Sequence, residues 1–169
     1  QKKFSAAREQ IDLILAERPN SYAALINLCE FTIEEGGLDR AEAILEKIEK
    51  LYSHNSRAAL ARGEIRLLRG DPESAEEALR TGIRGTAYYY RWELERGYRL
   101  LGEALEQTGK GEEAEFCGLL ADALHSAPDA YLAFIALAEE KIEGREMATA
   151  SKVLKVLEKM FPNNTRVAL

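Results

Sequence analysis

The sequence predicts an all-α fold, an α-solenoid of antiparallel helix pairs with about nine helices. The first observation is the recurrence of alanine at Ala7, Ala41, Ala75, Ala114 and Ala150, at intervals of 34, 34, 39 and 36 residues. A fixed period in this range is typical of repeat proteins, in which each unit buries its apolar face against the next. The second observation is that apolar residues follow helical spacing between these alanines, while glycine and proline gather at the ends of the units.

A second set of small residues precedes the last four alanines by 12 positions each. The set comprises Cys29, Gly63, Gly102 and Ala138. Two antiparallel helices about 8–10 Å apart can close only where a facing side chain is very small. We therefore expect the small packing positions to be Ala7, Cys29, Ala41, Gly63, Ala75, Gly102, Ala114, Ala138 and Ala150.

The segments around the alanines resemble one known repeat. GGLDRAEAILEKIEKLYSHN, GDPESAEEALRTGIRG, GKGEEAEFCGLLADALHSAP and EGREMATASKVLKVLEKMFPNN are similar to second helices of the tetratricopeptide repeat, a 34-residue helix-turn-helix unit. The resemblance implies a right-handed superhelix, one continuous solenoid that is part of a longer protein. Its expected parts are a lone second helix at 1–21, repeats at 22–55, 56–89, 90–130 and 131–164, and the start of a further repeat at 165–169.

Glycine, proline and capping residues place the first helices. Ser21 or Asn20 opens a helix that runs to about residue 35 and ends at Gly36-Gly37, and Asp39 with Glu42 offers a capping box for the next helix. Gly70-Asp71-Pro72 marks a second helix end and helix start, with Asp71 as N-cap and Pro72 in the first turn. The other three prolines lie at the ends of units, at Pro19, Pro128 and Pro162.

The third repeat departs from the period. Gly82 and Gly85 are expected to cut the preceding helix short, and the next helix should run from about residue 86 to residue 108, which is unusually long. At 100° per residue, its inward face comprises Tyr90, Leu94, Tyr98, Leu101 and Leu105. A second stripe lies on the far side and comprises Tyr88, Trp92, Arg96, Arg99 and Glu103.

A ladder of glutamates occupies the ninth position of every unit, at Glu30, Glu64, Glu103 and Glu139. In the family this side of the first helices lines the concave groove that holds peptides or partner helices, so the resemblance implies an acidic groove and a basic partner. The glutamates do not need a bound ligand to be tolerated, because two carboxylates about 10 Å apart in water repel by only ~0.4 kcal/mol. The alternative is that these glutamates form a solvated helix face and pair with basic side chains on neighbouring turns, such as Arg99 beside Glu103.

Apolar pairs flank the ladder on the side that should face the adjoining unit, at Ile26 and Ile33, Leu60 and Leu67, and Ile135 and Ile142. In the third unit, Arg99 and Glu106 take these places and interrupt the apolar seam. The neighbouring Trp92, Arg96 and Arg99 are therefore the first candidates for a partner contact, since interface hot spots favour tryptophan and arginine. The alternative is that Tyr88, Tyr89 and Trp92 pack on the second unit.

The sequence predicts no catalytic site, metal site or cofactor. His54 and His125 come at the ends of second helices, and Cys29 and Cys117 occupy interior positions without a zinc spacing. The Gly109-Lys110-Gly111 stretch matches a dinucleotide-loop pattern, but no strand precedes it. A net charge of −6 and a pI near 5.2 weigh against nucleic acid. No apolar run is long enough to predict membrane insertion.

Together these features predict a non-catalytic scaffold that binds a partner peptide, helix or domain in its concave groove. Within that class the expectation is a component of a larger bacterial-type assembly or export apparatus. One alternative is a regulatory repeat array attached to a catalytic domain outside these residues. Another is a groove that binds a cationic polysaccharide, with Trp92 stacking on a sugar and the glutamates accepting hydrogen bonds.

Overall fold

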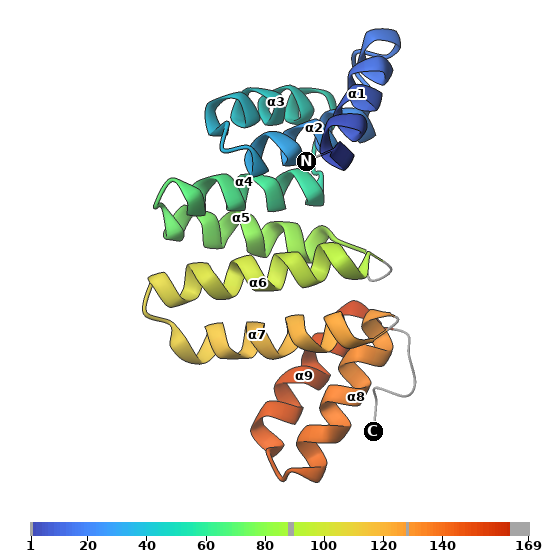
Figure 1. The fold of residues 1–169 in the computed structure, drawn as a ribbon. Helices are drawn as coiled ribbons and strands as arrows, with labels where there is room; N and C mark the ends of the chain where they lie inside the picture. The colour runs from blue at the N-terminus through green and yellow to red at the C-terminus, as the bar shows by residue number, and fades with distance from the viewer. Residues whose placement is uncertain (1, 88–89, 128, 163–169) are drawn as a thin grey trace. The chain divides into compact units, whose positions relative to one another are not determined.

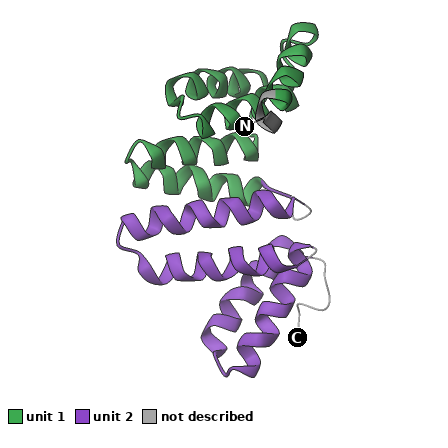
Figure 2. Cartoon of the chain, viewed as in Figure 1, with its two compact units in different colours: residues 1–85 green, residues 86–169 purple. Residues whose placement is uncertain are grey.

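Nine α-helices and no strands make up the part of the chain that the structure describes, which is residues 2–87, 90–127 and 129–162 of a computed structural model (Figure 1). The helices form two compact units, Gln1–Gly85 and Thr86–Leu169 (Figure 2). Unit 1 contains α1 (Lys2–Glu17), α2 (Tyr22–Glu34), α3 (Leu38–Leu51), α4 (Ser56–Leu68) and α5 (Pro72–Gly85). Unit 2 contains α6 (Arg91–Gln107), α7 (Gly111–Ser126), α8 (Ala130–Glu143) and α9 (Met147–Met160).

Consecutive helices form four antiparallel pairs, α2–α3, α4–α5, α6–α7 and α8–α9, and α1 packs on α2 (Figure 1). The all-α prediction is confirmed, as is the expected number of helices within the described residues. Residues 165–169, expected to begin a further repeat, lie outside the described residues.

All four pairs turn through the same backbone motif. One residue in each turn has a positive φ, at Gly36 (78°), Gly70 (76°), Gly109 (76°) and Arg145 (61°). The amide after it donates to the carbonyl five residues back, as Gly37 does to Thr32 at 2.9 Å and Glu146 does to Lys141 at 2.8 Å. This is the Schellman arrangement, which satisfies the last carbonyls of the first helix and starts the chain back along it. Glycine suits the left-handed residue because it has no Cβ, so Arg145 is the strained member of the set.

Small residues lie where the two helices of a pair come closest. The Cys29 thiol donates to the carbonyl of Ala41 at 3.5 Å. A methyl group added to Gly63 would lie 3.3 Å from the Ala75 carbonyl, and one added to Gly102 would lie 3.4 Å from the Ala114 carbonyl. In three pairs, therefore, a thiol or a glycine faces the backbone of the recurring alanine. Ala138 and Ala150 of the fourth pair are each 2% exposed, and Ala7 on α1 is half-buried.

Branched aliphatic residues fill the space around these contacts. In unit 1 one buried cluster joins α2, α3 and α4, and its largest members are Leu25, Ile26, Ile33, Leu45, Ile48 and Ile65. In unit 2 the fully buried large side chains are Leu94, Leu105, Leu120, Leu124, Phe134 and Leu157. Tyr98 meets Phe134 edge to face at 6.4 Å between ring centroids, which links α6 to α8.

The helices around the third repeat differ from expectation. α5 is not cut short at Gly82 but continues to Gly85. Gly82 serves close packing instead, because a methyl group there would lie 2.6 Å from Cδ2 of Leu60. α6 begins at Arg91 rather than near residue 86, although at 17 residues it is still the longest described helix. Tyr90 is consequently its N-cap and is 41% exposed, so the prediction of an inward-facing Tyr90 is wrong.

Helix caps follow the predictions only in part. Asp71 accepts a hydrogen bond from the Ser74 amide at 3.2 Å, as expected of an N-cap. Asp39, in contrast, lies in the first turn of α3, where Gly37 is the N-cap, and its carboxylate pairs with Arg69 at 2.7 Å. The Schellman turn explains the difference, because it brings the chain into helical geometry immediately after the left-handed Gly36.

The close packing can be tested by making the same glycine-to-alanine change at two equivalent positions. Gly63→Ala would place a methyl group 2.4 Å from Cγ of Leu79, whereas Gly102→Ala would meet only the Ala114 carbonyl and Cβ of Cys117, at 3.4 and 3.6 Å. We expect Gly63→Ala to lower the free energy of unfolding by about 1–2 kcal/mol. We expect Gly102→Ala to raise it by up to about 1 kcal/mol through helix propensity. Urea unfolding followed by circular dichroism measures both, and equal effects would contradict the packing described.

Candidate functional site

One face of α6 carries the residues that combine exposure with binding chemistry. Six of its side chains line a pocket of about 430 Å³, namely Trp92, Glu95, Arg96, Arg99, Leu100 and Glu103. Their spacing of three or four residues places them along one side of the helix. The opposite side of α6 is buried through residues such as Leu94, Leu101 and Leu105, which holds the pocket face toward solvent. We call these six residues the α6 pocket.

Trp92 is the most exposed large aromatic side chain among the described residues. It is 62% exposed, and its ring meets that of Tyr90 edge to face, with the centroids 6.3 Å apart. An exposed indole presents a broad apolar surface that loses contact with water when a partner covers it. The alternative from the sequence, that Trp92 packs on the second repeat, stays a prediction. Tyr88 and Tyr89 lie outside the described residues.

Ion pairs anchor the polar part of the α6 pocket to α7. Glu95 contacts Nδ1 of His125 at 2.9 Å and Arg99 at 3.3 Å, and Arg99 also lies 3.5 Å from Asp122. Partial burial acts to raise the pKa of Glu95, but hydrogen bonds from His125 and Arg99 and the attraction of these basic groups outweigh it, so the pKa is lowered. Glu95 is therefore held ionised between two basic side chains.

Arg91 connects the start of α6 to the end of α7. Its Nη1 donates to the carbonyl of Leu124 and, at 3.1 Å, to that of His125. These carbonyls belong to the last turn of α7 and carry the partial negative charge of the helix C-terminus. Arg91 thus satisfies backbone acceptors and fixes the helix end that bears the α6 pocket, a role that the sequence analysis missed.

The glutamate ladder is not uniform. Glu30 accepts a hydrogen bond from Nε of Arg57 at 2.9 Å, and Arg57 also donates to Asn27. Glu64 is half-buried and engaged with neighbouring groups. Glu103 and Glu139 are exposed, and Glu103 accepts from Gln107 at 3.5 Å. The pairing of Arg99 with Glu103, one alternative at the sequence level, is not formed, because Arg99 pairs with Glu95 and Asp122.

The apolar pairs that flank the glutamate ladder are buried in unit 1 and partly exposed in unit 2. Ile26, Ile33, Leu60 and Leu67 are all at most 7% exposed. Ile135 is half-buried and Ile142 is 46% exposed. On α6, Arg99 and Glu106 are both exposed, as expected where polar residues replace the aliphatic pair.

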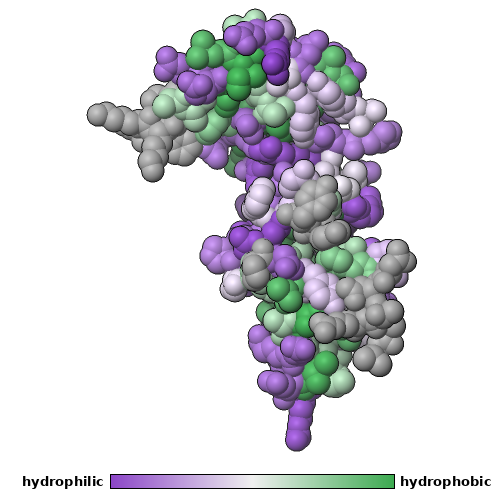
Figure 3. All heavy atoms as spheres, turned by 90° about the vertical axis from the view of Figure 1, so that its right-hand side faces the viewer, coloured by the Kyte–Doolittle hydropathy of each residue, from purple (hydrophilic) through white to green (hydrophobic). Residues whose placement is uncertain are grey.

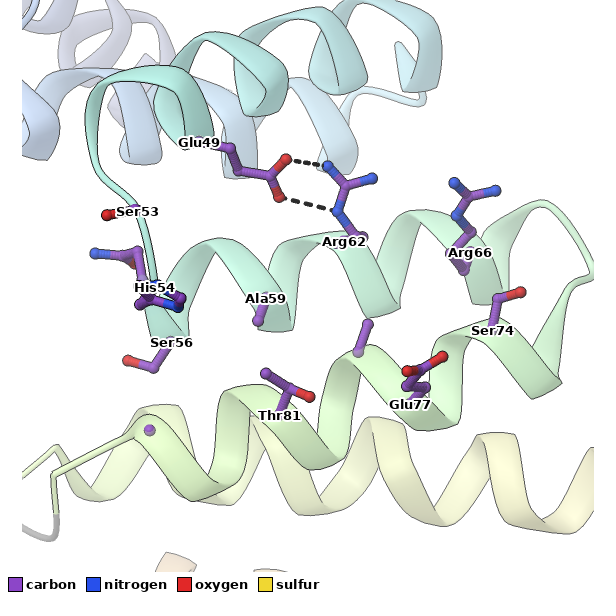
Figure 4. Close-up of a pocket in the computed structure, with 13 residues that line it drawn as sticks. Glu49, Ser53, His54, Ser56, Ala59, Arg62, Arg66, Ser74, Glu77 and Thr81 are labelled. Carbon is purple, nitrogen blue, oxygen red and sulfur yellow. Dashed lines mark hydrogen bonds and ion pairs between the residues drawn. The ribbon is translucent and has the colours of Figure 1, made fainter.

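A second pocket lies in unit 1 and was not foreseen from the sequence. It encloses about 770 Å³ between α3, α4 and α5, and its charged lining residues are Glu49, Arg62, Arg66 and Glu77 (Figure 4). Arg62 crosses to α3 and donates through Nε to Glu49 at 2.9 Å. Small side chains such as Ala59, Ala78 and Thr81 leave the space open, and their helical spacing is the signal that could have revealed it. Its arginines are engaged with the carboxylates of their own unit.

The histidines and cysteines form no reactive cluster among the described residues. Cys29 and Cys117 are buried free thiols. His54 is exposed in the α3–α4 connection with a φ of 59°. Within residues 2–87, 90–127 and 129–162, no group of three His, Cys, Asp or Glu side chains is placed to hold a metal ion. Over the same residues, no helix is both long and apolar enough to cross a membrane.

The Glu95 network makes stability depend on pH in one direction. Because the pKa of Glu95 is lower in the folded than in the unfolded chain, the unfolded chain takes up the proton first as the pH falls. The stabilisation from Glu95 is thus present above about pH 4.5 and is lost as the pH falls through the folded pKa. We expect Glu95→Gln to weaken the loss of stability between about pH 6 and pH 3, measured by urea unfolding. Glu115→Gln, an exposed position on α7, should leave the loss unchanged, and parallel curves for Glu95→Gln and the unaltered chain would contradict the network.

No protein-family model and no curated protein matches the sequence. Solved structures do match the fold. A crystal structure of MamA is similar with a TM-score of 0.55 and 19% identity over 92% of this chain and 88% of that one. A second MamA structure matches with a TM-score of 0.55 and 17% identity over 99% and 86% of the two chains.

A chain of the APC/C hetero-tetramer Cut9–Hcn1 is similar with a TM-score of 0.63 and 15% identity. The match covers 99% of this chain and 32% of the Cut9–Hcn1 chain, so this chain spans about a third of that array. Such low identities speak for the fold alone, and the matched structures are tetratricopeptide-repeat solenoids. The chain therefore has the tetratricopeptide-repeat fold, an α-solenoid of antiparallel helix pairs.

Proposed function

We propose that the chain is a non-catalytic scaffold that binds a segment of a partner protein at the α6 pocket. The observation that carries the proposal is the 62% exposure of Trp92 at the edge of a pocket whose polar groups are already positioned. Tryptophan and arginine supply much of the binding energy in protein interfaces, and a preorganised site loses little side-chain entropy on binding.

The geometry of the α6 pocket favours a segment of mixed character. Trp92 and Leu100 offer apolar contact, while the exposed Arg99 and Glu103 offer charges of both signs within about two helical turns. An apolar side chain over Trp92 with polar neighbours fits this face better than a purely basic peptide does. The ion pair of Glu30 with Arg57 supports the same choice, because it neutralises one end of the acidic ladder.

A place in a larger assembly is part of the proposal. The Cut9–Hcn1 structure is a hetero-tetramer, so one solved protein with a similar array works together with other chains. By analogy, we place this chain within a multi-protein assembly.

A cationic polysaccharide is a second candidate for the same pocket. The exposed indole of Trp92 in the same pocket as the exposed carboxylate of Glu103 is the observation that favours it, since a sugar ring stacks on an aromatic face and a cationic sugar pairs with a carboxylate. Titration with a cationic oligosaccharide separates the two candidates. A saturable change in Trp92 emission with the sugar, and none with the partner protein, would favour the sugar.

Replacement of Trp92 should separate binding from stability. We expect Trp92→Ala to weaken partner binding by about tenfold or more, while the free energy of unfolding changes by less than about 0.5 kcal/mol because the side chain is mostly exposed. The measurement is affinity capture from a cell lysate with both proteins in parallel, followed by titration of the captured partner. Trp92 is the only tryptophan, so its emission reports the contact directly.

Leu68→Ala is the matched control, because Leu68 is 57% exposed on α4 in the other unit. It should leave binding unchanged. Equal losses of stability and affinity in Trp92→Ala would show that the side chain acts in packing, and an unchanged affinity would exclude the α6 pocket as the binding site.

A further inference from the structure

The second pocket, in unit 1, lies where the chain departs from its own repeat. We call it the α4 pocket, because it follows α4, with lining residues from α3 and α5 on either side (Figure 4). The small residue and the recurring alanine are 12 positions apart in every pair, so α4–α5 aligns with α8–α9 without a gap when Gly63 is matched to Ala138. The two pairs can thus be compared position by position.

The residues that fill the equivalent space in unit 2 are replaced by smaller ones in α4–α5. On α4, Ala59 stands in the place of Phe134, which is 0% exposed. On α5, three lining residues stand in the places of larger apolar ones, with Ala78, Thr81 and Gly85 corresponding to Val153, Val156 and Met160 of α9. α8 and α9 are so apolar that such side chains also reach their surface, in the lowest part of Figure 3. The α4 pocket is therefore a space that the repeat normally fills with its own side chains.

Arg62 forms one wall of the α4 pocket in a fixed orientation. It stands in the place of the buried Leu137 of α8. Its Nε donates to one carboxylate oxygen of Glu49 at 2.9 Å, and its Nη2 donates to the other (Figure 4). Arg62 and Ala59 are three residues apart and so lie on the same side of α4. A guanidinium held by a bidentate pair offers its flat face to an aromatic ring that enters beside it.

One hydrogen-bond donor and one acceptor of the α4 pocket are available to a ligand. Arg66 lies 3.8 Å from Glu42 and 3.9 Å from Asp71, too far for a hydrogen bond, and its guanidinium donates to no other residue that the structure describes. Glu77 of α5 is exposed and forms no ion pair or hydrogen bond within the described part of the chain. Arg66 can therefore donate to a bound molecule, and Glu77 can accept from it.

The α4 pocket is long and open at both ends. Its lining residues on α4 run from Ser56 to Arg66, which is about 15 Å along the helix at about 1.5 Å per residue. Ser53 and Ser74 lie at its two ends and are exposed. An extended chain advances about 3.3 Å per residue, so about five residues match this length. The volume of about 770 Å³ leaves room for a ring and for the backbone on either side of it.

The charges that line the α4 pocket favour a ligand without a large net charge. Two arginines are matched by two glutamates among the lining residues, and Glu42 and Asp71 lie beside Arg66. A strongly anionic ligand would meet these carboxylates, and a strongly cationic one would meet the arginines. A peptide backbone suits the pocket better, because each residue other than proline brings one N–H donor and one C=O acceptor.

We propose that the α4 pocket binds an extended segment of a partner protein through one aromatic side chain. The ring takes the place that Phe134 fills in unit 2, over Ala59 and against the flat face of Arg62. The backbone on either side of the ring accepts a hydrogen bond from Arg66 and donates one to Glu77. The α4 pocket shares no residue with the α6 pocket, so each proposal can fail without the other.

The probe is a pentapeptide, Gly-Gly-Phe-Gly-Gly, blocked at both ends so that it carries no charge. We expect it to shift the amide NMR signals of Ala59, Ala78 and Gly85 saturably in the 169-residue chain. The same peptide with alanine at its centre should bind roughly tenfold more weakly or worse, because it lacks the ring that fills the space. Ala59→Phe supplies the ring from the chain itself, as Phe134 does in unit 2, and should also weaken binding by roughly tenfold or more.

Matched variants separate the α4 pocket from general effects on the chain. Ala136→Phe makes the same change at an exposed position of α8 and should leave binding unchanged. Arg66→Met removes the donor and should weaken binding by roughly fivefold, whereas Arg40→Met, at an exposed position of α3, should not. Ala78→Val fills the same space from α5 and decides the matter if Ala59→Phe does not fold. Unchanged binding in Arg66→Met or in either folded filling variant, or absence of saturable shifts, would overturn the proposal.

Other occupants of the α4 pocket give distinct results. Benzyl alcohol that binds as tightly as the pentapeptide would overturn the proposal in favour of a small aromatic molecule. Peptide binding that appears only when Tyr88→Ser and Tyr89→Ser are combined would overturn it in favour of the chain's own segment after α5. A dimer in sedimentation equilibrium that Ala59→Phe dissociates would overturn it in favour of a second copy. Loss of pentapeptide binding in Trp92→Ala would overturn it in favour of the α6 pocket.

Discussion

The structure depends on the close approach of two antiparallel helices at one small side chain in each pair. Where Gly63 faces the partner helix, even a methyl group would lie 2.4 Å from Cγ of Leu79, so no larger residue fits there without displacing its neighbours. The Schellman turns complement this contact, because they return the chain directly along its own helix. A pair made in this way buries apolar residues on both helices and leaves an apolar side that a neighbouring helix must cover.

Neighbouring pairs in unit 1 satisfy that requirement through both apolar and charged contacts. The aliphatic seam of Ile26 and Ile33 supplies most of the burial, while the arginines of α4 pair with carboxylates of α2 and α3. Exposed ion pairs contribute little to stability, about 0–1 kcal/mol each, so their main effect is on alignment. Because Arg57 of α4 pairs with Glu30, the glutamate ladder is not a uniform acidic surface.

The same requirement is met differently on α6 and on α8–α9. On α6 the seam positions carry Arg99 and Glu106, and the adjoining face presents Trp92 and a network anchored on Glu95. On α8–α9 the seam remains aliphatic, but Ile142 is exposed. The α6 surface is thus polar with one large aromatic anchor, and the proposal about binding starts from this difference from a regular repeat.

The sequence by itself determined the all-α class, the helix pairing and the stripe of Trp92, Arg96, Arg99 and Glu103, because each follows from spacing along one helix or from a period along the chain. Only the tertiary structure decided that Tyr90 is exposed, that Gly82 packs against Leu60 inside α5, and that Arg57 takes up Glu30. The tertiary structure also decided that Arg91 of α6 binds carbonyls at the end of α7 and that a pocket lies beside Glu49. The physical reason is that these contacts join residues about 20 to 35 positions apart, whose distances depend on how helices pack. A helical wheel gives the direction of a side chain, and only the neighbouring helix decides whether that direction leads to solvent, to a carbonyl or to an opposite charge.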